Sequence, residues 1–203
     1  MIAIVDYGVG NLFSLRSSLR YLGLGAEVTA DADILRRADR IILPGVGAFA
    51  DARARLDDTG LTPLLLEEAE RKPLLGICLG MQLLFERSFE YGEHPGLGLV
   101  PGQVVDLRGD LSDRALKVPH MGWNSLQIVK DDPLFRYFKE GEYVYYVHSF
   151  YARGCAPATL GTSQYGNVAV TGVVRNGYVY GTQFHPEKSG DAGLRLLRAF
   201  AEL

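Results

Sequence analysis

The sequence predicts an α/β fold with three layers, in which helices flank both faces of a mixed, mainly parallel sheet. In the first half, short apolar runs alternate with segments whose apolar residues recur at helical spacing, which is typical of parallel strands joined by helices. In the second half, apolar runs follow one another closely, and Asn176-Gly177 between two of them predicts a hairpin. The 203 residues, 47% of them hydrophobic, suffice for one domain with a sizeable core, so we expect a single domain over 1–203.

The first half supplies the parallel strands and most of the helices. Ile2–Val5 and Arg40–Leu43 are short apolar runs, as expected of strands covered on both faces, and a third strand begins at 73–75. Leucines at positions 12, 15, 19 and 22 predict a helix that Gly23 and Gly25 end. Further helices are predicted over 48–56, over 61–71 and from the turn at 76–80 to about residue 89.

The second half predicts strands at 103–107, 143–147, 168–175 and 178–184, which would make one side of the sheet antiparallel. A last helix carries the apolar residues Leu194, Leu197, Phe200 and Ala201, and Ser189 is a candidate N-cap.

Composition excludes several classes of protein. The formal net charge of −3 argues against a general nucleic-acid binder. No apolar stretch approaches the roughly 20 residues of a membrane span, and no signal peptide is recognisable, so we expect a cytoplasmic protein. Two cysteines form no disulfide framework, and no cluster has metal-ligand spacing. Gly8-Val9-Gly10 lacks the third glycine of a dinucleotide fingerprint, and we expect no cofactor.

The segment 76–80, Gly-Ile-Cys-Leu-Gly, has the pattern of a nucleophile elbow. Cys78 would stand at the carboxyl end of a buried strand, above a helix N-terminus whose dipole favours the reactive thiolate. Taken alone, the pentapeptide also fits a small buried cysteine in a glycine-bracketed turn.

A catalytic cysteine needs a base, and His185 has the setting for one. It follows a predicted strand, and Glu187 two residues later would face the same way and orient its ring. The glycines of Pro-Gly-Val-Gly at 44–47 leave backbone N–H groups free, so Val46 and Leu79 are candidates for a two-donor oxyanion hole.

Three motifs together carry a family resemblance. Pro-Gly-Val-Gly at 44–47, Gly-Ile-Cys-Leu-Gly-Met-Gln at 76–82 and Phe-His-Pro-Glu-Lys at 184–188 resemble class I, or triad, glutamine amidotransferases over nearly the whole chain. The resemblance implies their flavodoxin-like fold and a Cys78–His185–Glu187 triad that hydrolyses glutamine through a thioester. It also implies that the substrate contacts are Gly47, Gln82, Glu90, Ser149 and Phe150.

Within that family, the chain is similar to the glutaminase subunits of imidazole glycerol phosphate synthases. The similar features are Tyr-Gly-Val-Gly-Asn at 7–11, His-Met-Gly-Trp-Asn at 120–124, and Lys188. This implies histidine biosynthesis and a heterodimer in which ammonia passes to a (β/α)₈-barrel cyclase. The residues assigned to the partner face or the ammonia passage are Asn11, His120, Trp123, Asn124 and Lys188.

Two alternatives remain open from the sequence. The first is the glutaminase subunit of another synthase, such as those making anthranilate, aminodeoxychorismate or pyridoxal phosphate, with the same chemistry and a different partner. The second is a cysteine peptidase or a binding module on the same scaffold. Neither nucleic acid nor a membrane is expected as a partner.

Overall fold

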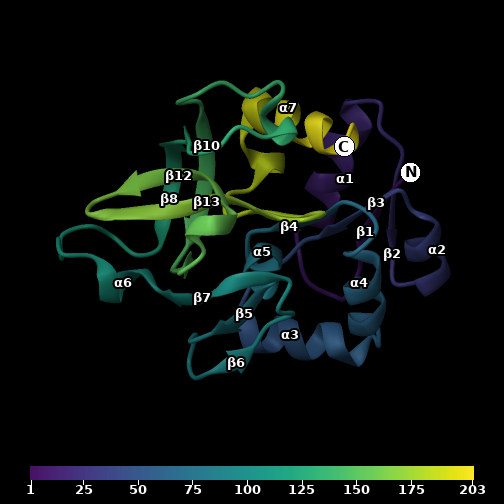
Figure 1. Ribbon diagram of the computed structural model, residues 1–203, viewed down its shortest axis with the longest axis horizontal. Helices are drawn as coiled ribbons and strands as arrows, with labels where there is room; N and C mark the ends of the chain where they lie inside the picture. Colours follow the sequence, from purple (N-terminus) through teal and green to yellow (C-terminus); the bar gives the residue numbers. More distant parts are fainter.

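The computed structural model describes all 203 residues and has a central sheet of eight strands (Figure 1). Their order across the sheet is β2-β1-β3-β4-β14-β13-β12-β9. Neighbours from β2 to β14 are parallel, and the three pairs beyond β14 are antiparallel, which confirms the mixed sheet. The strands are β1 (Ile2–Val5), β2 (Ala26–Thr29), β3 (Arg40–Leu43), β4 (Leu74–Ile77), β9 (Gln127–Ile128), β12 (Thr159–Tyr165), β13 (Val168–Asn176) and β14 (Val179–Thr182).

Helices cover both faces of this sheet, so the three-layer prediction is confirmed. The helices are α1 (Leu12–Tyr21), α2 (Ala32–Arg37), α3 (Phe49–Asp58), α4 (Thr62–Glu68), α5 (Leu79–Leu83), α6 (Leu107–Asp110) and α7 (Gly190–Ala201). Successive β1 side chains point to opposite faces: Ile2 and Ile4 share one core cluster with α1 and α7, and Ala3 and Val5 share a second with α2 to α5. This alternation explains why β1 is apolar throughout.

Two smaller sheets lie outside the central one. One has the order β11-β7-β5-β6, from β5 (Phe85–Ser88), β6 (His94–Pro95), β7 (Val100–Asp106) and β11 (Phe150–Arg153). The other pairs β8 (His120–Ser125) with β10 (Tyr143–His148) in antiparallel register. The predictions at 103–107 and 143–147 are therefore right as strands, but these strands do not extend the central sheet.

The predicted helix from 79 to about 89 is wrong in its second half. Helix α5 ends at Leu83, and Phe85–Ser88 forms β5, with Phe85 and Ser88 buried and the two residues between them exposed. Strand β5 takes its backbone partners from β6 and β7, so distant pairing overrides the local helical spacing.

Two details of the turns also differ from expectation. Asn176 pairs with Val179, so Gly177 and Tyr178 form the hairpin loop, one residue later than predicted. Ser189 precedes α7 but does not cap it, because its hydroxyl donates to the His185 carbonyl and accepts from the Tyr145 N–H.

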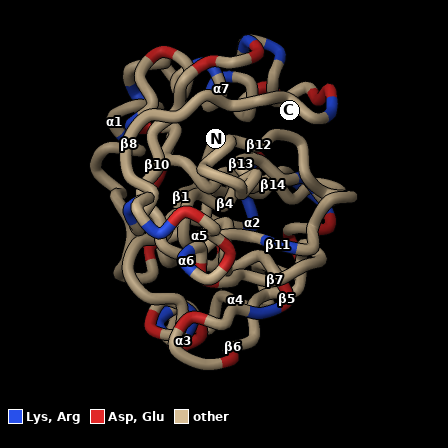
Figure 2. The backbone as a smooth tube through the Cα atoms, turned by 90° about the vertical axis from the view of Figure 1, so that its left-hand side faces the viewer, with Lys and Arg blue, Asp and Glu red and all other residues tan.

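Charged residues are spread over the molecule. Figure 2 shows acidic and basic positions interspersed along the backbone, in keeping with the formal net charge of −3. None of the helices combines the length and the apolar character needed to cross a membrane.

Candidate active site

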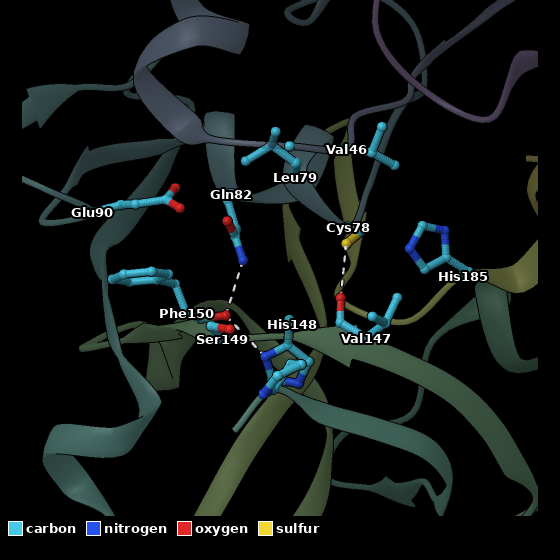
Figure 3. A pocket seen from close by; sticks show the side chains of 12 residues that line it. Val46, Cys78, Leu79, Gln82, Glu90, Val147, His148, Ser149, Phe150 and His185 are labelled. Carbon is cyan, nitrogen blue, oxygen red and sulfur yellow. Dashed lines mark hydrogen bonds between the residues drawn. The ribbon is translucent and has the colours of Figure 1, made fainter. Parts of the chain in front are cut away.

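Three neighbouring strands of the central sheet, β3, β4 and β14, deliver the candidate catalytic segments to one edge. Because the strands are parallel, the 44–47 loop, Cys78 and His185 all follow carboxyl ends. They meet at a cavity of about 310 Å³ (Figure 3). Its lining is Val46, Gly47, Cys78, Leu79, Gln82, Glu90, Pro119, Val147, His148, Ser149, Phe150 and His185.

Cys78 occupies the sharp turn that the glycine pattern predicts. It links β4 to α5 with φ 55° and ψ −110°, and it is one of only two non-glycine residues with positive φ. A Cβ on Gly80 would lie 1.9 Å from the Leu43 carbonyl oxygen, and one on Gly76 would lie 2.6 Å from the Gly80 oxygen. Only glycine fits these flanks, so close packing holds Cys78 in a strained conformation of the kind found at nucleophile elbows.

The Cys78 sulfur lies in the wall of the cavity with two polar neighbours besides the imidazole. The Val147 carbonyl oxygen is 3.9 Å from the sulfur, and the Gln183 side-chain N–H donates to it at 3.8 Å. Gln183 is fully buried, and the sequence reasoning missed it. The sequence did carry a sign of this role: Gln183 stands at the end of an apolar strand, two residues before His185, and a buried amide there needs a hydrogen-bond partner.

His185 lies beside the sulfur and forms the expected pair with Glu187. The ring Nδ1 and Glu187 Oε1 are 2.8 Å apart, and each side chain is only 3% exposed. This bond leaves Nε2 on the side of the ring that faces Cys78 (Figure 3). The local geometry differs from the expected extended segment, because Pro186–Lys188 is a single 3₁₀ turn that brings the carboxylate back to the ring.

The environment favours a protonated imidazole. Burial by itself lowers the pKa of His185, but the hydrogen bonds and charges of Cys78 and Glu187 outweigh it and raise the pKa to about 9. The second carboxylate oxygen of Glu187, Oε2, is buried and makes no hydrogen bond. A thiol next to an imidazole that readily takes and holds a proton is the arrangement required for a thiolate nucleophile.

Two segments of the cavity wall, the 44–47 loop and the start of α5, have backbone N–H groups without an acceptor. Val46 and Gly47 donate no hydrogen bond within the protein. Leu79 is the first residue of α5, where an N–H has no intrahelical acceptor. The loop lies close to the elbow, since a Cβ on Gly45 would be 2.6 Å from the Gly80 nitrogen. Residues with free backbone donors from two segments therefore line the same cavity as Cys78.

The other end of the cavity carries acceptors. Gln82 Nε2 donates to the Phe150 carbonyl at 3.0 Å and to Gln183 Oε1 at 3.1 Å, which uses both of its protons. Glu90 Oε2 accepts from the Phe49 N–H at 2.7 Å, and burial raises the pKa of Glu90. The Gln82 carbonyl oxygen and the Glu90 carboxylate are thus available to a ligand with an amino group.

The predicted partner-face residues divide into two groups. Trp123 is 56% exposed, Lys188 is exposed, and Asn11 and Asn124 are half-buried. His120 is only 3% exposed, so its side chain lies inside the protein, behind this face. The ring lies beneath that face because it stacks 4.7 Å from the Tyr146 ring and 4.2 Å from the Tyr165 ring.

Comparisons with known proteins show which sequences the chain resembles over its whole length. The family model described as "Glutamine amidotransferase class-I" matches residues 3–202. The chain is 49% identical to the "Imidazole glycerol phosphate synthase subunit HisH" of Lacticaseibacillus casei, covering 100% of this chain and 96% of that protein. It is 50% identical to the HisH subunit of Bacillus licheniformis with the same coverage, and 46% identical to that of Caldanaerobacter subterraneus.

Solved structures show the same fold at lower identity. A structure titled "Crystal structure of glutamine amidotransferase" aligns with a TM-score of 0.76 at 20% identity, covering 100% of this chain and 98% of that one. A structure of PurLQS from Thermotoga maritima aligns with a TM-score of 0.73 at 22% identity, covering 99% and 97%. The fold expectation is therefore confirmed.

Proposed function

The chain belongs to the class-I glutamine amidotransferase family and, within it, to the HisH subunits of imidazole glycerol phosphate synthase; on this premise we propose that it hydrolyses glutamine and supplies ammonia for histidine biosynthesis. Residues 1–203 act as one glutaminase domain, which needs no metal or cofactor for this chemistry. The observation that carries the proposal is that Cys78 and His185 line one cavity and that Glu187 is hydrogen-bonded to the His185 ring.

The reaction begins with the Cys78 thiolate attacking the side-chain amide carbon of glutamine. The carbon becomes tetrahedral, and the N–H groups of Val46 and Leu79 stabilise the oxygen that gains negative charge. His185 gives its proton to the departing nitrogen, and ammonia leaves behind a γ-glutamyl thioester on Cys78. The now neutral His185 takes a proton from water, whose oxygen attacks the thioester and releases glutamate and the thiolate. Glu187 orients the imidazole and stabilises its protonated form.

The cavity also provides for recognition of the amino-acid end of glutamine. The Gln82 oxygen and the Glu90 carboxylate accept hydrogen bonds from the α-ammonium group, because the Gln82 amide protons are already used within the protein. Gly47 and the backbone of Ser149 and Phe150 contact the remaining main-chain groups. A residue inside a peptide chain lacks this free α-ammonium group, so the arrangement favours free glutamine over cleavage within a peptide.

The ammonia acceptor belongs to a second chain, a (β/α)₈-barrel cyclase that forms a heterodimer with this one. The residues assigned to the partner face or to the passage for ammonia are Asn11, His120, Trp123, Asn124 and Lys188. Because Cys78 and Cys155 are both free thiols, and the nucleophile must stay reduced, we place the protein in the cytoplasm.

Reconstitution tests the proposal. The chain is mixed with the cyclase subunit and its phosphorylated ribose ligand, and glutamate and the imidazole product are measured together. The proposal expects both products in equal amounts, and it expects Cys78→Ala to abolish both when glutamine is the nitrogen source. Coupling instead to an anthranilate, aminodeoxychorismate or pyridoxal phosphate synthase would overturn the choice of partner, and unimpaired turnover by Cys78→Ala would overturn the mechanism.

A further inference from the structure

Two buried histidines outside the triad form a hydrogen-bonded pair that the mechanism above does not use. His120 and His148 are opposite each other in the β8–β10 register and are 3% and 5% exposed. Their rings meet through His120 Nδ1 and His148 Nε2 at 3.0 Å. Burial lowers the pKa of His120 to about 4, and burial together with His120 and His185 lowers the pKa of His148 to about 3. Both rings are therefore neutral at neutral pH.

The surroundings fix the direction of every hydrogen bond in this group. The Phe150 carbonyl oxygen lies 2.9 Å from His148 Nδ1 and can only accept, so Nδ1 carries the proton. The bare His148 Nε2 then accepts from His120 Nδ1. The bare His120 Nε2 accepts from Asn124 Nδ2 at 3.3 Å, and the same amide nitrogen donates to the Gln164 carbonyl at 2.9 Å, which fixes its orientation.

One end of this chain of bonds lies at the proposed glutamine site. The Phe150 oxygen receives both the His148 N–H and the Gln82 N–H, so its two lone pairs are filled. Gln82 also donates to Gln183, which in turn donates to the Cys78 sulfur. A shift of the Phe150 carbonyl would therefore turn the Gln82 amide in the cavity.

The other end lies on strand β8, next to two exposed side chains. Asn124 follows Trp123 on β8, and both Trp123 and Met121 have more than half of their surface exposed, at 56% and 61%. The His120 ring stacks on Tyr146 and Tyr165, and the Tyr165 hydroxyl donates to the Lys117 carbonyl at 2.6 Å. The ring is thus clamped, and a movement of β8 carries His120 with it.

We propose that Asn124, His120 and His148 are positioning residues for glutamine binding. Their hydrogen bonds, called the histidine relay, hold the Phe150 carbonyl and Gln82 in place and link them to strand β8, where Met121 and Trp123 are exposed. The inference rests on the proposed function for its kinetic consequence. Its structural consequence is that Nδ1 carries the proton on both His120 and His148, which can be measured without an activity assay.

The first test reads the tautomers directly. Free neutral imidazoles favour the Nε2–H form, whereas the relay requires Nδ1–H on both rings. Long-range proton–nitrogen correlation spectra of the histidine-labelled full chain at pH 7 report which nitrogen is protonated, and His120→Phe and His148→Phe assign the signals. Two Nδ1–H tautomers are expected. An Nε2–H tautomer or a protonated imidazolium at either position would overturn the relay.

The second test separates positioning from folding, using the complex with the cyclase subunit. Asn124→Ala removes an amide that donates to the Gln164 carbonyl and to His120. Asn176→Ala is the matched control, because it also removes an amide that donates to a backbone carbonyl, that of Leu99, but has no contact with the relay. Asn124→Ala removes one bond of the relay and should raise the glutamine KM roughly two- to threefold. His120→Phe removes two bonds of the relay and should raise it roughly three- to tenfold, with kcat within about twofold for both variants. Asn176→Ala should leave the KM unchanged.

The outcomes are distinct. Lower melting temperatures with an unchanged KM in both Asn124→Ala and His120→Phe would show a merely structural role and overturn the positioning claim. Absence of glutaminase activity in the unmodified complex would refute the proposed function instead, and the tautomers would then decide the relay.

Discussion

Replacing Glu187 with glutamine is the most informative perturbation of the triad, because it removes one charge while keeping the shape. The carboxylate accepts from His185 Nδ1 at 2.8 Å, and both side chains are 3% exposed, so solvent screens the pair little. A hydrogen bond to a charged group contributes about 1.5–3 kcal/mol. At 1.36 kcal/mol per factor of ten, the expected loss in kcat/KM is about 10- to 150-fold.

The same change has a signature in the pH profile. Cys78 and Glu187 together outweigh burial and raise the pKa of His185 to about 9, and the imidazolium must be present to protonate ammonia. Activity of the unmodified enzyme should therefore fall as the pH rises through about 9. Removing the Glu187 charge removes one of the causes that raise this pKa, so the fall should move to lower pH.

The assay is glutamate formation in the complex with the cyclase and its ligand, measured from pH 6 to pH 10. Glu67→Gln is the matched control, because Glu67 pairs with Arg71 on the surface of α4 and both side chains are 57% exposed. If activity of Glu187→Gln falls at the same alkaline pH as that of the unmodified enzyme, and its kcat/KM is within twofold, the assigned role of Glu187 is refuted.

Three further outcomes are expected. Gly80→Ala should fail to fold or should lose several kcal/mol of stability, because its Cβ would lie 1.9 Å from the Leu43 oxygen, whereas Gly109→Ala has no atom within 4 Å and should be tolerated in thermal unfolding. Gln183→Leu should lower kcat severalfold by removing the N–H 3.8 Å from the sulfur, and equal single-turnover rates of thioester formation would contradict this. Acidification should destabilise the fold through His148, whose pKa is lowered to about 3 in the folded state, because the unfolded state takes up the proton first. Between pH 7.5 and 5.5, the free energy of unfolding measured in urea should therefore fall by about 1.4 kcal/mol more in the unmodified protein than in His148→Phe. Equal decreases would contradict the lowered pKa.

The sequence predicts best those parts of the molecule whose constraints are local. Strands β1 and β3 are covered on both faces, so they appear as apolar runs, and the elbow requires glycine at positions 76 and 80 because backbone atoms approach within 3 Å of a Cβ there. The triad follows from these constraints, since strands β4 and β14 are neighbours and parallel.

Parts that depend on distant pairing were not predictable in the same way. Residues 83–85, Leu-Leu-Phe, fit a helix, and only the partnership with β7 makes Phe85 the start of a strand. Strand β12 is rich in polar and small residues and gave no apolar run. His120 and His148 lie 28 positions apart and meet only through the β8–β10 register, so no local pattern marks them as a pair.

The account depends on Cys78 as the atom that attacks glutamine, and covalent trapping tests this most directly. The complex is treated with a glutamine-analogue electrophile, digested, and mapped by mass spectrometry, with Cys155 as the internal comparison because both thiols are free and buried. The account predicts one adduct per chain, on Cys78, and its suppression by excess glutamine. An adduct on Cys155, or labelling that glutamine does not slow, would contradict it.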